Sequence, residues 1–351
     1  MCSASSLEAL ISLAPYPSLA LLLALSSLSL FNLPHSALRH LDLSYNSLDG
    51  SLPDSFANLS ALLTLDLSFN NFVGEIPPSL GQCKAMQNLY LAGVSGRIPS
   101  QIWQLPALIE LQIVGGADWL LLEASMLQKF ASCPTIQALE LINVNATAGS
   151  AFPAYLSECK QLRALALDVI GLEGFIPAEL WQLPLLKFLM VLDREVSAGA
   201  DDRPFKLHGS LPSSFQCCQT IAELDVQGVN LTGEIPPSLG QCTALQKIAL
   251  SHGSLKGEIP KTLGNLSNLE MLNLQSHMLR GTIPKELFQA SGLTRLRLGD
   301  NRLHGFIPPS LGNCSALQDL VLSNIKLTGE IPPELAALPS SKSLTSPKTS
   351  S

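Results

Sequence analysis

The sequence predicts an α/β-type repeat solenoid, and two observations carry that prediction. Counted from Leu293 as offset 0, apolar residues fall at offsets 0, 3, 5, 10, 14, 18 and 21, and Leu317 starts the same pattern again. Pieces of the chain are also near copies, since residues 74–87 match residues 233–246 at 12 of 14 positions. A fixed period in the twenties is typical of a solenoid, in which each repeat stacks on the next.

The composition restricts the function classes. The chain has 351 residues, of which 46% are hydrophobic and 14% charged, so most of it can fold around a core. The net charge of −7 is spread thinly, without the concentrated basic face that nucleic acid requires. No apolar run reaches about 18 residues, so the sequence predicts no transmembrane helix. It contains no nucleophile–base constellation, phosphate loop or metal-ligand spacing, and we expect a non-enzymatic protein without cofactor or metal.

Residues 1–37 form an apolar N-terminal segment with two interpretations. Leu19–Leu25 is short and apolar enough for a signal peptide, but Glu8 is the only charged residue before Arg39, whereas a signal peptide normally starts with positive charge. The other interpretation is an irregular first repeat that covers the open apolar edge of the solenoid.

Residues 38–340 form the array of about twelve repeats. Offsets 0, 3 and 5 end in a Leu-x-Leu alternation that predicts a short strand, and equivalent strands would stack into one parallel sheet about 4.8 Å apart. Gly at offset 12 permits a turn, Pro at offset 15 ends regular pairing, and offsets 18 and 21 return along the outer side. The repeats start at Leu38, Leu62, Met86, Leu108, Ile136, Leu162, Leu186, Ile221, Leu245, Leu269, Leu293 and Leu317.

Two repeats and the tail are irregular. The repeat from Leu108 contains Asp118 and Trp119 and lacks Ile-Pro in its turn, and the repeat from Leu186 carries eleven extra residues. Such an insertion is either a solvated loop or a ligand contact. The tail at 341–351 is rich in Ser and Lys, and we expect it to be disordered.

The eight cysteines are expected to act mainly as small buried hydrophobic residues. Cys83, Cys242 and Cys314 stand at offset 21, where sister repeats carry Leu. A disulfide between neighbouring repeats, such as Cys218 with Cys242, stays open.

Offset 8 is expected to carry an inward Asn whose amide satisfies backbone groups of neighbouring repeats. Asn46, Asn70 and Asn301 fit this role. Other repeats carry residues such as Gly253 or His277 there, which we expect cannot supply the same pair of hydrogen bonds.

The pattern Leu-x-x-Leu-x-Leu-x-x-Asn-x-Leu-x-Gly-x-Ile-Pro resembles the plant-specific class of leucine-rich repeats. It covers about residues 38 to 340, and the turn is seen at Gly74–Pro77 and Gly305–Pro308. The chain is similar to the ectodomains of plant receptor-like kinases and receptor-like proteins. This resemblance implies a right-handed superhelix with the parallel sheet on its concave face, a short additional strand after the turn, and recognition of a ligand. A cysteine-flanked N-terminal cap and a C-terminal cysteine pair, both usual in that family, are missing.

The resemblance also suggests candidate ligand-binding residues on the concave face. In plant receptors of secreted peptide hormones, an Arg-x-Arg at offsets 2 and 4 holds the peptide's free carboxylate, and Arg295 and Arg297 match it. Because Asp319 follows Arg295 along offset 2, it could neutralise Arg295, so Arg297 is the better candidate. Neighbouring positions complete the candidate set: Lys247, Asn273 and Asp225.

Five Asn-x-Ser/Thr sequons are glycosylation candidates if the chain is secreted: Asn58, Asn145, Asn230, Asn265 and Asn313. Three of them share offset 20, where the repeat itself supplies Asn-x-Ser, so their number is weak evidence for secretion.

The sequence therefore predicts a recognition module that binds a peptide or protein ligand, with a co-receptor as a further partner, in plant signalling or defence. An alternative is a secreted inhibitor of cell-wall-degrading enzymes resembling polygalacturonase inhibitors. An acidic surface that faces an enzyme would favour the inhibitor, and a carboxylate site would favour the receptor-like function. We expect an extracellular or plasma-membrane-surface location, and an intracellular one stays open.

Overall fold

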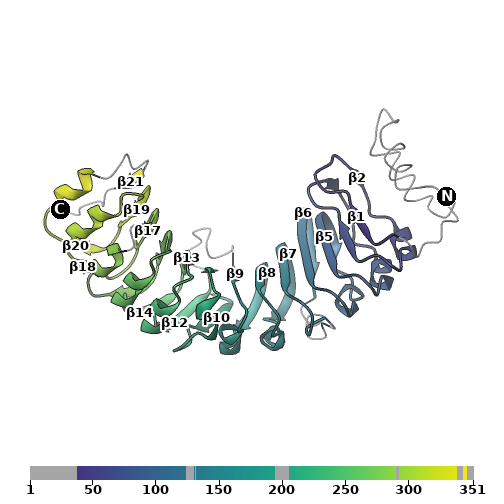
Figure 1. Ribbon diagram of the computed structural model, residues 1–351, viewed down its shortest axis with the longest axis horizontal. Coiled ribbons are helices and arrows are strands. Elements are labelled where there is room, and N and C mark those ends of the chain that lie inside the picture. The colour runs from purple at the N-terminus through teal and green to yellow at the C-terminus, as the bar shows by residue number, and fades with distance from the viewer. Residues whose placement is uncertain are drawn as a thin grey trace. The chain divides into compact units, whose positions relative to one another are not determined.

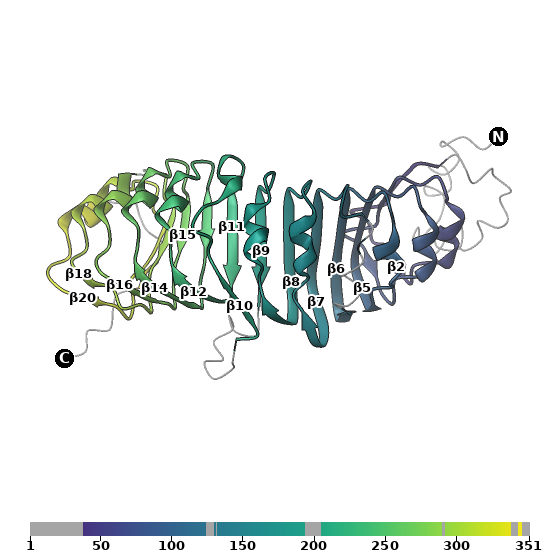
Figure 2. The same cartoon turned by 90° about the horizontal axis from the view of Figure 1, so that it is seen from below.

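The protein is described by a computed structural model that covers residues 38–123, 130, 132–193, 205–289, 292–337 and 343–345 (Figures 1 and 2). The chain divides into two compact units, Met1–Pro153 (unit 1) and Ala154–Ser351 (unit 2). Each repeat forms one rung of a unit. The predictions for residues 1–37 and for most of the insertion after Leu186 lie outside the described residues.

Unit 1 contains one parallel sheet whose strands follow one another in chain order. Its register pairs offset 2 of each repeat with offset 2 of the next, His40 with Thr64, Asn88 and then Glu110, which confirms the predicted repeat starts. A second short pair joins β2 (Asp49–Gly50) to β4 (Asn71–Phe72). The sheet consists of β1 (His40–Asp42), β3 (Thr64–Asp66), β5 (Asn88–Arg97), β6 (Glu110–Leu122) and β7 (Ala138–Ala151).

The last three strands of unit 1 are longer than the predicted short strand. They continue past the Leu-x-Leu segment and still pair with one another, with register shifts between Val94 and Gly96 and between Val114 and Leu120. The irregular repeat from Leu108 thus adapts through bulges, which absorb additional residues without ending the sheet.

Unit 2 has the same organisation, and after the long β8 its strands are short. The first row contains β8 (Ala164–Phe175), β9 (Phe188–Leu192), β11 (Glu223–Gln227), β13 (Lys247–Ala249), β15 (Met271–Asn273), β17 (Arg295–Arg297), β19 (Asp319–Val321) and β21 (Ser343–Thr345). After each turn a second row follows: β10 (Leu207–Ser210), β12 (Asn230–Glu234), β14 (Ser254–Glu258), β16 (Met278–Arg280), β18 (His304–Gly305) and β20 (Lys326–Leu327).

The second row confirms the additional strand that the resemblance implied. The turn glycine works as predicted, since Gly257 has a φ of +81° and Gly305 a φ of +90°. β21 departs from the expected disorder of the tail: Ser343–Thr345 pairs in register with Asp319–Val321, because β19 offers an open row of backbone hydrogen-bonding groups. The rest of the tail lies outside the described residues.

In both units the outer side is formed by 3-10 turns rather than α-helices (Figure 1). A proline at the N-cap fixes an extended backbone, as at Pro77 and Pro260, and the next few residues make one short turn before the chain returns. The turns are η1 (Asp54–Asn58), η2 (Pro78–Gln82), η3 (Ile102–Gln104), η4 (Ala154–Glu158), η5 (Ala178–Gln182), η6 (Gln216–Gln219), η7 (Pro237–Gln241), η8 (Lys261–Asn265), η9 (Lys285–Gln289), η10 (Pro309–Asn313) and η11 (Pro333–Ala337).

The core of each unit lies between the sheet and these turns. The inward leucines at offset 3, such as Leu65 and Leu272, are fully buried, and so are Leu80 and Leu263 on the outer side. Each such side chain contributes roughly 1.5–3 kcal/mol by burial, against about 1–2 kcal/mol per residue for ordering the backbone. A single rung therefore cannot fold alone, and its neighbours supply the missing contacts.

Asn70 and Asn301 confirm the predicted role of the inward Asn, whereas Asn46 is exposed and its amide donates only to the Leu43 and Ser44 carbonyls of its own rung. Asn301 accepts a hydrogen bond from the Leu279 N–H (3.0 Å) and donates to the Leu274 carbonyl (2.7 Å), and Asn70 makes the equivalent bonds to Leu48 and Leu43. These bonds satisfy backbone groups that would otherwise be buried without partners.

The prediction for His277 was wrong. Its Nδ1 accepts from the Leu255 N–H (3.3 Å), and its Nε2 bonds the Leu250 carbonyl. These are the same two backbone positions that Asn301 bonds one rung later. The imidazole replaces the amide because it also offers one acceptor and one donor when it is neutral.

A disulfide between neighbouring repeats, which the sequence left open, is present, and Cys133 and Cys159 are also disulfide-bonded rather than simple core residues. Cys218 and Cys242, which lie on neighbouring rungs and are 24 residues apart in sequence, form a disulfide. Cys83, Cys217 and Cys314 remain buried thiols, as expected. Burial raises the pKa of Cys217 to about 11, which makes it a poor nucleophile.

The neutral form of His277 makes the stability of unit 2 depend on pH. Burial lowers the pKa of His277 to about 4, whereas an unfolded His titrates near pH 6.5. The stabilisation is therefore complete above about pH 6.5 and is lost as the pH falls towards 4. In the unsubstituted protein the free energy of unfolding should therefore fall by up to about 3 kcal/mol over this pH range, and His277→Asn should remove that fall. Urea unfolding at several pH values across the range measures it. His304→Asn, at an exposed histidine, is the control, and equal pH slopes for the two variants would contradict the interpretation.

The disulfide should stabilise unit 2 by closing a loop. Cross-linking residues 24 apart lowers the entropy of the unfolded chain and is worth about 3 kcal/mol. We expect Cys218→Ser with Cys242→Ser to lower the melting temperature. A reducing agent should lower it more in the unsubstituted protein than in this variant, because Cys133 and Cys159 are disulfide-bonded in both. A melting temperature of the unsubstituted protein that does not respond to reduction would show that the bridge is absent.

Candidate ligand-binding groove

Side chains at offsets 2 and 4 of unit 2 lie on the side of the first row of strands that is opposite to the inward leucines, and this surface is called the sheet face. The register places Glu223, Lys247, Met271, Arg295 and Asp319 side by side at offset 2. It places Asp225, Ala249, Asn273, Arg297 and Val321 side by side at offset 4. Both rows were predicted from the repeat spacing.

An open groove of about 340 Å³ lies on the sheet face. It crosses β11, β13, β15 and β17, and most of its lining belongs to offsets 1 and 2 of these rungs. The lining residues are Glu223, Gln227, Gln246, Lys247, Glu270, Met271, Thr294 and Arg295. The groove, called here the Arg295 groove, is thus a surface to which four successive rungs contribute side chains.

The structure reverses the predicted roles of the two arginines. Asp319 pairs with Arg297, the diagonal neighbour, and not with Arg295: its Oδ2 lies 2.6 Å from Arg297 Nη2 and 2.7 Å from Nε. The side chain of Arg297 is still 40% exposed, so the pair is worth about 1 kcal/mol at most. Arg297 therefore already has an anionic partner, which removes the reason for preferring it to Arg295 as the ligand residue.

Arg295 is the available cation of the groove. Its side chain is exposed and forms no ion pair within the described residues. A guanidinium offers five N–H donors in a planar fork, which suits a carboxylate.

The three other predicted residues differ in availability. Lys247 lines the groove, but its Nζ lies 2.6 Å from Asp225 Oδ2, so it already has an anionic partner. Asp225 is buried, and its other oxygen accepts from Gln227 Nε2 at 2.6 Å. Asn273 is also buried, and its Oδ1 accepts from the Gln275 N–H at 3.1 Å. Asp225 and Asn273 thus support the sheet face rather than offer groups to a ligand.

Sequence reasoning missed several groove residues, above all Glu270 and Thr294 at offset 1. The predicted repeat starts would have placed them beside Lys247 and Arg295, but only offsets 2 and 4 were used to choose candidates. Their inclusion changes the electrostatics of the site. The groove has two cations and two carboxylates around Met271, so it can bind a ligand that carries both charges beside an apolar group.

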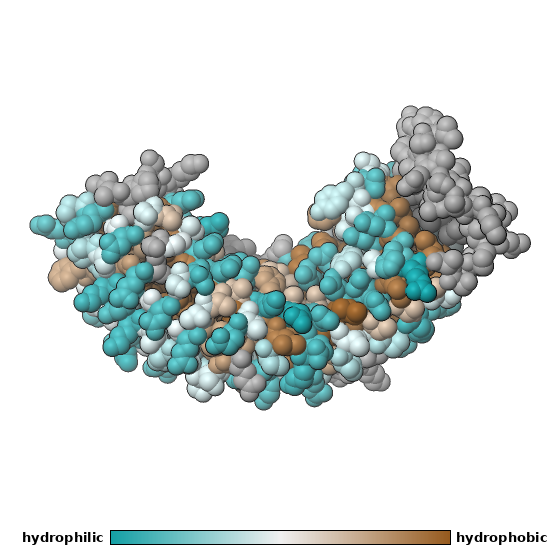
Figure 3. All heavy atoms as spheres, viewed as in Figure 1, coloured by the Kyte–Doolittle hydropathy of each residue, from teal (hydrophilic) through white to brown (hydrophobic). Residues whose placement is uncertain are grey.

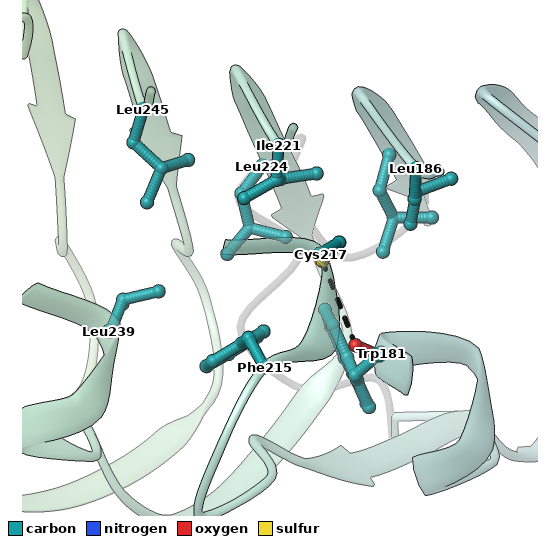
Figure 4. A pocket seen from close by; sticks show the side chains of 9 residues that line it. Trp181, Leu186, Phe215, Cys217, Ile221, Leu224, Leu239 and Leu245 are labelled. Carbon is teal, nitrogen blue, oxygen red and sulfur yellow. Dashed lines mark hydrogen bonds between the residues drawn. The ribbon is translucent and has the colours of Figure 1, made fainter. Parts of the chain in front are cut away.

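A second cavity in unit 2 is too small to hold a ligand. It measures about 10 Å³ and lies inside the core, between Trp181, Phe215 and Leu239, which Figure 4 shows converging on it. Cys217 Sγ donates to the Trp181 carbonyl at 3.7 Å at its edge. The lining is apolar, so the space is a packing gap of about one water molecule's size.

The five sequons lie in two kinds of place. Asn58, Asn265 and Asn313 are exposed at the ends of the 3-10 turns η1, η8 and η10. Asn145 and Asn230 are half-buried within β7 and β12. A glycan on the first three would extend from the outer side of the rungs.

The described residues show no metal site and no membrane-spanning helix. Figure 3 shows hydrophilic side chains interspersed with hydrophobic ones on the visible surface. Among the residues whose placement is described, no three His, Cys, Asp or Glu side chains are grouped to hold a metal ion. None of the helices in the same ranges is long and apolar enough to cross a membrane.

Comparison with known families finds the same repeat. A leucine-rich-repeat family model matches residues 21–93, and a second leucine-rich-repeat model matches residues 292–314. No curated protein matches the chain.

Similar solved structures are receptor ectodomains. The PEPR1–AtPEP1 complex is 30% identical with a TM-score of 0.63, over 85% of this chain and 43% of that one. The GASSHO1/SCHENGEN3 ectodomain of Arabidopsis thaliana, in complex with CASPARIAN STRIP INTEGRITY FACTOR 2, is 27% identical with a TM-score of 0.68, over 88% and 39%. The Arabidopsis receptor kinase HAESA, with the peptide hormone IDA and the co-receptor SERK1, is 27% identical with a TM-score of 0.54, over 86% and 60%. The chain thus spans between two fifths and three fifths of these proteins.

Proposed function

We propose that this chain, a leucine-rich-repeat protein similar to the ectodomains of plant receptor kinases, is a non-catalytic recognition module. It binds a peptide or protein ligand on the sheet face of unit 2. The observation that carries the proposal is the Arg295 groove, with an unpaired guanidinium at its edge. In this proposal a ligand carboxylate binds Arg295, and an apolar ligand group lies against Met271.

The ionic pattern of the groove supports a carboxylate ligand. Arg297 and Lys247 already have carboxylate partners, so a second carboxylate would gain little from them. Arg295 is bare, and a ligand that supplies its counter-charge gains a charge-assisted hydrogen bond without displacing an existing one. Glu223 and Glu270 would face basic groups elsewhere on the same ligand.

The comparisons support the ligand class. PEPR1, GASSHO1/SCHENGEN3 and HAESA were each solved in complex with another polypeptide, and for HAESA this is a peptide hormone together with a co-receptor. By analogy we propose a peptide ligand and a co-receptor partner for this chain, in plant signalling or defence.

We further propose an extracellular or plasma-membrane-surface location. The Cys218–Cys242 disulfide favours an oxidising compartment, and three sequons are exposed on the outer side of their rungs.

The alternative function, inhibition of cell-wall-degrading enzymes, is favoured by a different observation. Asp42, Asp66, Glu110 and Glu140 lie at offsets 2 and 4 of unit 1, which makes the solvent side of its sheet acidic. An acidic surface is what an enzyme-binding inhibitor of this type was expected to present.

The carboxylate proposal is tested with peptides selected on the full chain from a pool with free carboxyl ends. Resynthesised as C-terminal amides, they should bind at least about tenfold more weakly, because the amide cannot neutralise Arg295. Arg295→Ala should weaken peptide binding to the same extent, and Arg297→Ala should weaken it less. Arg302→Ala, which changes an exposed arginine of the adjacent turn, is the control and should leave binding unchanged. Equal affinity of acid and amide would reject the carboxylate site and leave the inhibitor function as the better candidate.

Glycan occupancy is expected to separate the five sequons. When the chain is expressed in a plant secretory system, Asn58, Asn265 and Asn313 should be glycosylated, because their side chains are exposed. Asn145 and Asn230 should be occupied much less, because Oδ1 of each is buried and a glycan would have to leave the strand sideways. Peptide mass spectrometry after glycosidase treatment measures each site, and full occupancy of Asn230 would contradict this distinction.

A further inference from the structure

Two aromatic side chains of unit 1 are exposed where a soluble surface rarely carries them. Tyr45 is 76% exposed and Phe69 is 61% exposed. Their rings stack on each other, with centroids 4.3 Å apart and an interplanar angle of 15°. The two residues stand at offset 7 of neighbouring rungs, directly after β1 and β3. Together they form a small apolar surface, called here the aromatic platform.

The backbone at this position makes the aromatic residues costly. Tyr45 has a φ of +54° and Phe69 a φ of +52°, in the left-handed region that bulky residues avoid. Other rungs place small or polar residues at offset 7, such as Gly93 and Asn143 in the same unit. Neither ring reaches the core, so burial does not compensate the unfavourable backbone. Strained residues that serve no packing role are often found at binding sites.

The surroundings of the platform are acidic. Asp42 and Asp66 stand three residues before the rings on the same two rungs. Each carboxylate accepts hydrogen bonds from a serine two residues later, Ser44 or Ser68. The side-chain hydrogen bond from Ser44 lowers the pKa of Asp42, which keeps this carboxylate charged.

The acidic character continues along the sheet of unit 1. Glu110 and Glu140 stand at offsets 2 and 4 of later rungs. The Lys and Arg residues in the described part of the unit are few: Arg39 directly precedes β1, Lys84 precedes β5, and Arg97 pairs with Glu123 at the end of β5. The charge around the platform therefore favours a positively charged partner.

We propose that Tyr45 and Phe69, flanked by Asp42 and Asp66, form a docking surface for a basic segment of a protein partner. A guanidinium or ammonium group of that segment lies over the exposed face of a ring and points its N–H donors towards the carboxylates. The exposed ring face attracts a cation through its quadrupole, and the nearby carboxylates add to this attraction. Aromatic residues in this arrangement are typical anchors of protein interfaces.

This surface is separate in composition from the Arg295 groove. The platform selects positive charge, whereas Arg295 selects negative charge, so the two can be tested independently. The inference goes beyond the proposed function, because it holds whether or not a carboxylate binds in unit 2.

The test uses Tyr45→Asn with Phe69→Asn in the full chain. Asn tolerates the left-handed backbone and already occupies this position at Asn143, so the double variant should keep or raise the melting temperature. The probe is a labelled short peptide of alternating Arg and Gly, followed by fluorescence polarisation at low salt. We expect the double variant to bind the probe about tenfold more weakly than the unsubstituted chain. Phe175→Asn is the matched control, because Phe175 is 75% exposed in unit 2, and it should change nothing.

Three further measurements separate the proposal from its rivals. Asp42→Asn with Asp66→Asn keeps an acceptor for the serines but removes both charges, and it should weaken the Arg peptide severalfold. A matched peptide with Glu in place of Arg should not bind. Binding of a neutral oligosaccharide such as cellohexaose in place of the Arg peptide would overturn the proposal in favour of sugar stacking. Unchanged Arg-peptide binding in the Tyr45/Phe69 variant would also overturn the proposal. A large fall in the melting temperature of that variant would do the same, because the two rings would then have a structural role.

Discussion

Every rung of this protein depends on its neighbours to cover it. A repeat has too few apolar side chains to fold alone, and its strand has backbone groups that only the next strand can satisfy. Stacking solves both problems at once, but only if equivalent residues come into register. The pairing of Glu223, Lys247, Met271 and Arg295 at one offset follows from this constraint. The inward side chains are therefore fixed by the stack, and the outward ones are left available for recognition.

The register could be predicted from the sequence because it depends on the inward pattern alone. Leucines at offsets 0, 3 and 5 can face the core in only one alignment, since a shift by one residue would turn them to solvent. The ion pairs could not be predicted in the same way. Arg297 reaches Asp319 across the diagonal, because long side chains extend beyond the residue directly opposite. Comparing only equal offsets therefore assigned Asp319 to the wrong arginine.

The inward polar position illustrates a different limit of sequence reasoning. A repeat consensus identifies Asn301 by residue type, but the fold requires only an acceptor and a donor at two fixed backbone positions. His277 meets that requirement through its two ring nitrogens. The disulfide between Cys218 and Cys242 is similar, because a Cys that replaces Leu in the core fits there as a thiol or as half of a bridge, and the residue type alone left both alternatives open. In both cases the geometry of neighbouring rungs, and not the residue type, decides the role.

Outward positions can retain features that cost stability, because the stack does not depend on them. Tyr45 and Phe69 occupy a backbone conformation that Gly or Asn adopts more easily, and neither ring contributes to the core. Arg295 is exposed and forms no ion pair with any residue that the structure describes, whereas Arg297 beside it has one. If folding alone determined these residues, a smaller or paired side chain would serve equally well at each position. The stack thus supplies rigid spacing, and these few uncompensated side chains are where that spacing can be used to bind another molecule.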